Sequence, residues 1–153
     1  MSETVEAYIY QPAESEKRWM GETATHFLAT GALTGAAFAL VEEQAKRGVS
    51  VPLHLHRADM ESFFVLEGEI SFFLGNEAPV RAVAGAFAHI PGGTVHGFRI
   101  ESEIARYLIL TTPRHADFYR AITSPVPFAA IEGSVIGQAC EKYGVEFVGA
   151  LPG

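Results

Sequence analysis

Cysteine, basic residues and long hydrophobic runs are all scarce in this chain of 153 residues. The single cysteine, Cys140, has no partner for an intramolecular disulfide, which also excludes a Cys-rich zinc finger or a thioredoxin-like site. Eleven Lys and Arg residues against 18 Asp and Glu residues give a formal net charge of −7, which repels nucleic-acid phosphates and anionic membrane surfaces. The longest apolar runs, such as 63–66 and 104–110, fall far short of the roughly 20 residues of a bilayer-spanning helix. We therefore expect no nucleic-acid partner and no membrane span.

The overall composition indicates a folded protein. Hydrophobic residues make up 48% of the chain and charged residues only 19%, which excludes a disordered or fibrous chain. No repeat, linker or charge block divides the sequence, so we predict one domain over 1–153. Acidic residues stand within 1–6, where a secretory signal would carry basic ones, and we predict a cytoplasmic protein. We interpret Cys140 as a small residue on a helix face rather than a catalytic thiol.

Short apolar runs separated by glycine or proline dominate the first two thirds of the chain. They lie at 36–43, 60–67, 69–74, 78–83, 85–90, 96–100 and 104–111. Such regular spacing is typical of an all-β sandwich or barrel, and we predict a barrel core over about 23–111. Residues 36–41 and 62–66 are apolar at both strand parities, so we expect these strands to be buried on both faces, one face lying against a second layer or subunit. This pattern predicts a homodimer.

Helical spacing replaces the strand pattern after these runs. Thr112 followed by Pro113 is typical of a helix start. A second helix is predicted to begin at Pro127 and to stop at Gly144. We expect a helical segment over about 112–153 that closes off the β region.

Two histidines, a glutamate and a third histidine follow a spacing that suits a metal site. His54 and His56 are two residues apart, so on a strand both side chains point the same way. A turn over 57–60 could return Glu61, at the start of the next strand, to the same ion. His96 follows a Pro-Gly-Gly turn and could supply a fourth ligand from a distant strand. The alternative is a set of solvated strand histidines without an ion.

These residues belong to two motifs framed by glycines. The motif positions are Gly48, His54, His56, Glu61 and Gly68, followed by Gly85, Pro91, Gly93 and His96. Their order and spacing resemble the two motifs of the cupin superfamily at nine of ten positions. Ile100 stands where the second motif ends in asparagine. That asparagine is not a metal ligand in the family, so the difference concerns a local hydrogen bond.

The resemblance implies a fold and an activity. The fold is a conserved double-stranded β-helix, a small antiparallel barrel of jelly-roll type with the metal inside. The single-domain layout, with the segments 63–69 and 117–120, is most similar to the quercetin-dioxygenase-like single-domain cupins. This similarity implies a metal-dependent dioxygenase that oxidises or cleaves an apolar or aromatic small molecule with O2.

The predicted ligand set indicates which ions would suit the site. Three imidazoles and one carboxylate fit one divalent Fe, Mn, Co or Ni ion, with Zn as a further option. An octahedral ion would keep two positions open, for a substrate oxygen and for dioxygen, whereas a structural zinc would be closed by four ligands. Glu61 could also accept the substrate proton. Two other functions stay open: a non-oxidative isomerase, cyclase or lyase that uses the metal as a Lewis acid, and a non-catalytic metabolite-binding protein.

Four apolar residues share strand parity with the predicted ligands. We predict that they line a substrate pocket, although ordinary core positions explain them equally well. The set is Phe63, Val65, Phe98 and Ile100.

Three further histidines and a tyrosine have no spaced partner. His26, His89 and His115 are expected at surface or hydrogen-bonded positions, although His89 could reach the cavity. Tyr107 is expected to pack in the core.

Overall fold

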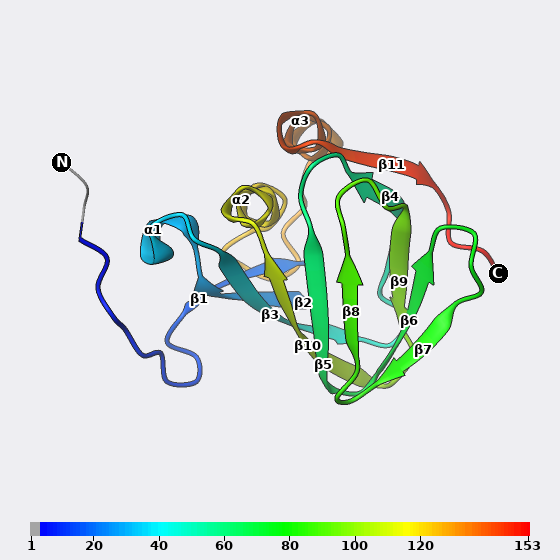
Figure 1. Cartoon of the computed structure of the whole chain (residues 1–153), viewed down its shortest axis with the longest axis horizontal. Coiled ribbons are helices and arrows are strands. Elements are labelled where there is room, and N and C mark those ends of the chain that lie inside the picture. Colours follow the sequence, from blue (N-terminus) through cyan, green and yellow to red (C-terminus); the bar gives the residue numbers. More distant parts are fainter. Residues whose placement is uncertain (1–3) are drawn as a thin grey trace.

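Two antiparallel sheets face each other in the computed structural model, which describes residues 4–153 (Figure 1). One sheet has the strand order β1-β2-β3-β10-β5-β8, and the other has the order β11-β4-β9-β6-β7. The strands are β1 (Glu16–Met20), β2 (Thr23–Ala29), β3 (Ala39–Lys46), β4 (Ser50–His56), β5 (Glu61–Glu67), β6 (Glu69–Leu74), β7 (Val80–Val83), β8 (Phe87–Ile90), β9 (His96–Ile100), β10 (Ile104–Thr111) and β11 (Val145–Gly149). The all-β architecture is confirmed. The acidic N-terminus at 1–6 lies partly outside the described residues.

Each predicted apolar run overlaps a strand, and the offset is largest for the first run, which begins three residues before its strand. β3 begins at Ala39 because the preceding short helix α1 (Gly31–Thr34) ends in residues with positive φ, Gly35 at 64° and Ala36 at 62°. Residues 36–38 are consequently exposed. The expectation that 36–41 is buried on both faces is therefore wrong for its first half.

The core lies between the two sheets, where strand residues alternate between inside and outside. On β5, Phe63 and Val65 are 1% exposed, whereas Phe64 between them is 41% exposed. This alternation places one face of the strand in the core and the other in solvent. Within one chain, the run 62–66 is thus not buried on both faces as predicted.

Two helices lie beside one end of the sheets (Figure 1). Helix α2 (Pro113–Ala121) begins as predicted, because the Thr112 hydroxyl accepts a hydrogen bond from the His115 N–H at 3.0 Å. Helix α3 (Gly133–Tyr143) begins six residues later than the predicted start at Pro127. A positive φ of 60° at Phe128 is incompatible with a continuous helix there.

The segment expected to be helical to the end of the chain contains a strand. Gly144, with φ of 73°, ends α3 as predicted. The chain then extends as β11 and pairs with β4, which would otherwise be the edge strand of the second sheet. No helix within residues 4–153 is long and apolar enough to cross a membrane.

Candidate metal centre

Three histidines of the two motifs meet on adjacent strands of the second sheet. His54 and His56 project from the same face of β4, and His96 begins β9 directly opposite His54. The ring centroids of His54 and His96 are 4.2 Å apart, and those of His56 and His96 are 4.9 Å apart. All three side chains are buried.

A bulge in β4 sets the direction of the first histidine. Between the pairs Val51–Phe98 and His54–His96, β4 contains one more residue than β9. Pro52 lies in this bulge, where its lack of an N–H costs no hydrogen bond of the sheet. Its carbonyl accepts a hydrogen bond from His54 Nδ1 at 2.8 Å.

The protonation state of the histidines suits metal binding. The Thr94 carbonyl accepts from His96 Nδ1 at 2.9 Å, as the Pro52 carbonyl does from His54. A proton on Nδ1 leaves the Nε2 lone pair of each ring free for an ion. Burial, reinforced by neighbouring imidazoles, lowers the pKa of His54 to about 4, and burial lowers the pKa of His56 to about 3. Both rings are therefore neutral near pH 7.

Glu61 completes the cluster from the first residue of β5. Its Oε1 lies 3.3 Å from His96 Nε2, and the four possible ligand atoms lie within 4.8 Å of one another. With the His96 proton on Nδ1, the lone pairs of His96 Nε2 and Glu61 Oε1 face each other and repel. A cation bound between the two atoms would remove this repulsion. Two atoms bound to one ion at about 2.1 Å each are roughly 3.0 to 3.4 Å apart. The donor set therefore fits a divalent ion.

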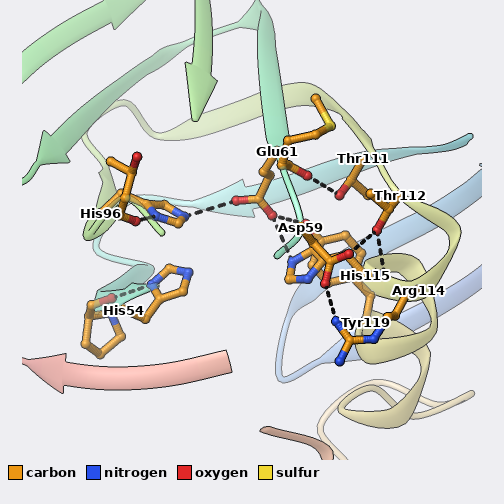
Figure 2. Close-up of polar contacts among 12 residues, drawn as sticks. His54, Asp59, Glu61, His96, Thr111, Thr112, Arg114, His115 and Tyr119 are labelled. Atoms are coloured by element: carbon orange, nitrogen blue, oxygen red, sulfur yellow. Dashed lines mark hydrogen bonds and ion pairs between the residues drawn. The ribbon is translucent and has the colours of Figure 1, made fainter. Parts of the chain in front are cut away.

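Helix α2 approaches the other oxygen of Glu61 (Figure 2). His115 Nε2 lies 3.2 Å from Glu61 Oε2, and the Tyr119 hydroxyl donates a short hydrogen bond to the same oxygen. His115 Nδ1 is buried without a hydrogen-bond partner among the described residues, as expected if the ring proton is on Nε2. The ring centroids of His115 and His56 are 3.9 Å apart. His115 is hydrogen-bonded, as predicted, but its place at the site was not foreseen.

The charge of Glu61 is strongly favoured in this setting. Burial by itself would raise the pKa of the carboxyl, but the hydrogen bond from His115 leads the contacts that outweigh burial and hold the pKa well below its usual value. Burial and the neighbouring Glu61 charge raise the pKa of Tyr119 well above its usual value, so its hydroxyl stays a donor. Sequence spacing held one signal for this pair, because residues 115 and 119 share a helix face.

A buried carboxylate ties the start of α2 to the turn before Glu61. Asp59 accepts hydrogen bonds from the Thr112 hydroxyl at 2.8 Å and from Arg114 at 2.7 Å (Figure 2). The Thr111 hydroxyl donates to the Met60 carbonyl at 2.6 Å. The turn and the helix start therefore form one unit that fixes the position of Glu61. No sequence motif pointed to Asp59.

A cavity of about 630 Å³ opens from the cluster, with His54, His56 and Glu61 in its wall. Its lining is otherwise mainly apolar. Of the four residues predicted to line a substrate pocket, Phe63 and Phe98 line this cavity. Val65 and Ile100 do not line it, and all four residues belong to the hydrophobic core. Strand parity alone cannot separate cavity wall from core, because both lie on the inner face.

The other histidines and Tyr107 occupy different surroundings. His89 is exposed on β8, hydrogen-bonds Ser62 at 2.7 Å and does not line the cavity. His26 is half-buried on β2, and burial lowers its pKa. Tyr107 is buried, as expected, yet it also lines the cavity. Cys140 packs on α3 beside a small apolar cluster.

Comparison with known proteins agrees with this site. The family model described as a cupin domain matches residues 40–111, which carry both motifs. The chain contains a cupin domain. It is 30% identical over 123 residues to quercetin 2,3-dioxygenase from Bacillus subtilis, a match that covers 80% of this chain. The chain spans 36% of the length of that relative.

Solved cupin structures share the fold at low sequence identity. KdgF from Halomonas sp. has a TM-score of 0.65 and 18% identity, covering 73% of this chain and 98% of its own. A predicted oxalate decarboxylase from Thermotoga maritima has a TM-score of 0.61 and 20% identity, covering 69% and 98%. A sugar phosphate isomerase from Silicibacter pomeroyi has a TM-score of 0.58 and 20% identity, covering 69% and 75%. The last two names denote different reactions, so the shared fold leaves the reaction of this cupin open.

Proposed function

We propose that this cupin is a metal-dependent dioxygenase of the quercetinase type, acting on an apolar or aromatic small molecule with O2. The observation that carries the proposal is the buried His54, His56 and Glu61 cluster in the wall of a 630 Å³, mainly apolar cavity. The volume falls in the range of small-molecule sites, and few polar groups interrupt the lining. The 30% identity to a quercetin 2,3-dioxygenase supports the choice of reaction.

We infer that His54, His56, Glu61 and His96 hold one divalent ion, of Fe, Mn, Co, Ni or Zn. When bound, such an ion supplies Lewis-acid polarisation of a substrate oxygen and a place where O2 can meet the substrate. The neutral imidazoles and the ionised carboxylate need no proton loss before they bind it.

The residues of the chain then have distinct tasks. Glu61 Oε1, the oxygen not held by His115 and Tyr119, accepts the proton of the substrate hydroxyl, which the bound ion would make more acidic. Tyr119 and His115 hold its Oε2 and so keep the carboxylate oriented toward the cluster. Phe63 and Phe98 pack against the substrate ring and exclude water from it.

Oxygen uptake tests the proposal. The purified protein is stripped with a chelator, reloaded separately with Fe(II), Mn(II), Co(II), Ni(II) or Zn(II), and mixed with quercetin in an oxygen-electrode cell. We expect uptake that depends on both the metal and quercetin. Turnover of a substrate at equal rate under strict anaerobiosis would favour the non-oxidative alternative. Lack of uptake with every metal and a panel of flavonols would contradict the proposal.

A further inference from the structure

An acidic residue interrupts the apolar inner face of β3. Val41, Glu43 and Ala45 alternate onto this face, and Val41 and Ala45 are almost completely buried. A carboxyl group between two such residues is costly unless it is hydrogen-bonded. Glu43 was not among the predicted site residues, because an isolated acid in a strand carries no spacing signal.

Two hydroxyl groups flank this carboxyl in a row across the sheet. Thr25 on β2 and Tyr107 on β10 are the register partners of Glu43 on either side. The Thr25 hydroxyl donates to Glu43 Oε2 at 2.7 Å. Thr25 and Tyr107 are both 1% exposed, and all three residues line the cavity.

Glu43 is not balanced by a cation within residues 4–153. Among the described residues, no Lys, Arg or His forms an ion pair with its carboxylate. Burial, together with the charge of Glu61, raises its pKa to about 7, although the hydroxyls of Thr25 and Tyr107 oppose this rise. A carboxyl group has more hydrogen-bonding capacity than the two neighbouring hydroxyls use, so it can bind a further hydroxyl group from the cavity.

The acidic row is displaced from the metal cluster along the sheet. Glu43 pairs with Tyr107 on β10, whereas Glu61 pairs with Thr111 on the same strand. Four residues along a strand correspond to about 13 Å. Glu43 also lies outside the set of possible metal ligands. The same cavity thus has polar groups in two separate places on a mainly apolar wall.

We propose that Glu43, held between Thr25 and Tyr107, is a substrate-binding subsite for a hydroxyl group at the end of an aromatic molecule remote from the metal. This inference rests on the proposed function, which places the other end of the molecule at the cluster. It assigns the substrate class more narrowly: ring compounds that carry a hydroxyl distant from the metal-facing oxygen. An apolar cavity with a buried hydrogen-bonding group discriminates strongly against an analogue that lacks the matching hydroxyl.

Binding of two flavonols tests the subsite. Quercetin and 3-hydroxyflavone share the ring skeleton and the 3-hydroxyl, but only quercetin carries the remote hydroxyls. Their Kd values are measured by fluorescence titration on the Ni(II)-loaded protein under argon, so that no oxygen-dependent turnover occurs. We expect the wild type to prefer quercetin by about 10-fold or more, as one hydrogen bond to an ionisable group implies.

Matched variants separate binding from a structural role. Glu43→Leu should reduce the preference to about 2-fold with little change in the Kd of 3-hydroxyflavone, and Glu43→Gln should retain part of it. Glu42→Gln is the control. Glu42 directly precedes Glu43 on β3, but it forms an ion pair with Arg106 and does not line this cavity. If Glu43→Leu does not fold, Glu43→Gln decides, with melting curves as the folding check.

The outcomes also separate this subsite from the dioxygenase proposal. Equal preference in the wild type and in the Glu43 variants would mean that Glu43 only supports the sheet, and would overturn the subsite. A wild type that binds both flavonols equally, or binds neither, would overturn it as well. Oxygen uptake is measured on the same preparations in air. Its absence after reloading with each of the five metals, beside an intact quercetin preference, would refute the dioxygenase reaction alone.

Discussion

The two oxygens of Glu61 face different partners. Oε1 lies toward the histidine cluster, at 3.3 Å from His96 Nε2, and Oε2 lies toward His115 and Tyr119 on α2. One oxygen is thus placed for an ion while the other is fixed by the protein. Substitutions at Glu61 and at Tyr119 should therefore have different effects on metal binding and turnover.

We expect Glu61→Gln to retain metal more weakly, because three histidines remain, while turnover falls by a factor on the order of 10² to 10⁴ through loss of the base. His54→Ala and His96→Ala should lose metal and activity together. Metal content, melting temperature and turnover are compared on the same purified variants.

Tyr119→Phe is the matched change at the second oxygen. It removes one hydrogen bond to Oε2 and leaves all four ligands, so we expect metal affinity to fall by roughly 10-fold, as is typical for partners of ligands.

Full metal content and undiminished turnover in Glu61→Gln would exclude the role of Glu61 as proton acceptor. The structural-zinc alternative predicts a different result for the same variant. In that case Glu61→Gln should lower thermal stability and leave ligand binding nearly intact.

The raised pKa of Glu43 makes a second residue-scale prediction. Burial makes the folded state bind its proton more tightly than the unfolded state, with a pKa of about 7 against 4.5. Below pH 4.5 the group is protonated in both states, and stability is lost as pH rises from 4.5 to about 7. Glu43→Gln should therefore be more stable than wild type at pH 8, by on the order of 1 to 2 kcal/mol, and less so at pH 5.

Urea unfolding of both proteins at the two pH values measures this difference. Thr25, Tyr107, Glu61 and Tyr119 are the polar groups that influence Glu43, and all remain in the variant. A stability difference that is equal at pH 5 and pH 8 would show that Glu43 has an ordinary pKa.

At the scale of elements, the site depends on packing between parts that are distant in sequence. The turn of the second motif lies against the turn of the first, because the Gly93 N–H donates to the His56 carbonyl at 2.6 Å. A Cβ on Gly92 would lie 2.9 Å from the Ala58 backbone. The two motifs therefore need a small residue where they meet.

The turn between β5 and β6 makes a similar demand on Gly68. Its φ is +86°, and a Cβ there would overlap the Ile104 carbonyl oxygen and lie 2.9 Å from Ala105 Cα. Gly75 is the matched control, with φ of +55° and open space where a methyl group would lie. We expect Gly68→Ala to cost roughly 2 to 5 kcal/mol of unfolding free energy, and Gly75→Ala about 1 to 2 kcal/mol. Chemical denaturation measures both, and equal losses would contradict the close approach.

Strand β11 protects the edge of the ligand-bearing strand. Val145 and Phe147 pair with His56 and His54, so β4 is bonded on both sides. A chain ending at Gly144 would leave β4 as an edge, and we expect a lower melting temperature and a metal affinity reduced by about 10-fold or more. A chain ending at Leu151 is the control, since it keeps β11. Unchanged metal affinity in the shorter chain would show that β9 alone holds the histidines.

At the scale of the whole molecule, the outer face of the six-stranded sheet carries an apolar strip. Phe64 and Phe87 are direct cross-strand partners there, 41% and 66% exposed, and Leu66 and Leu110 extend the strip. Exposed aromatic side chains gathered on one face are typical of an association surface. We therefore retain the homodimer as a prediction and assign this strip to the interface.

Light scattering at micromolar concentration measures the assembly. We expect twice the chain mass of 16.5 kDa for the wild type and the single-chain mass for a Phe64→Asp/Phe87→Asp double variant. Val126→Asp is the control, because Val126 is 56% exposed outside the strip and should not affect association. A wild type of 16.5 kDa would contradict the dimer.

Local spacing was enough to predict the all-β fold, most strands of the core and the start of α2, although no apolar run marked β2, which contributes Phe27 to the core. A strand repeats every two residues, so His54 and His56 had to share a face, and the two motifs supplied Glu61 and His96 by resemblance. These features depend on neighbours in the sequence. They did not require knowledge of which strands lie side by side.

Cross-strand register and helix docking decided the rest. The row of Thr25, Glu43 and Tyr107 exists only because three strands pair in one register, and no spacing in the chain encodes that register. His115 and Tyr119 reach Glu61 because α2 docks beside the first motif. β11 forms because β4 offers unpaired backbone groups at its edge, and such an edge is created only when the sheet itself has assembled.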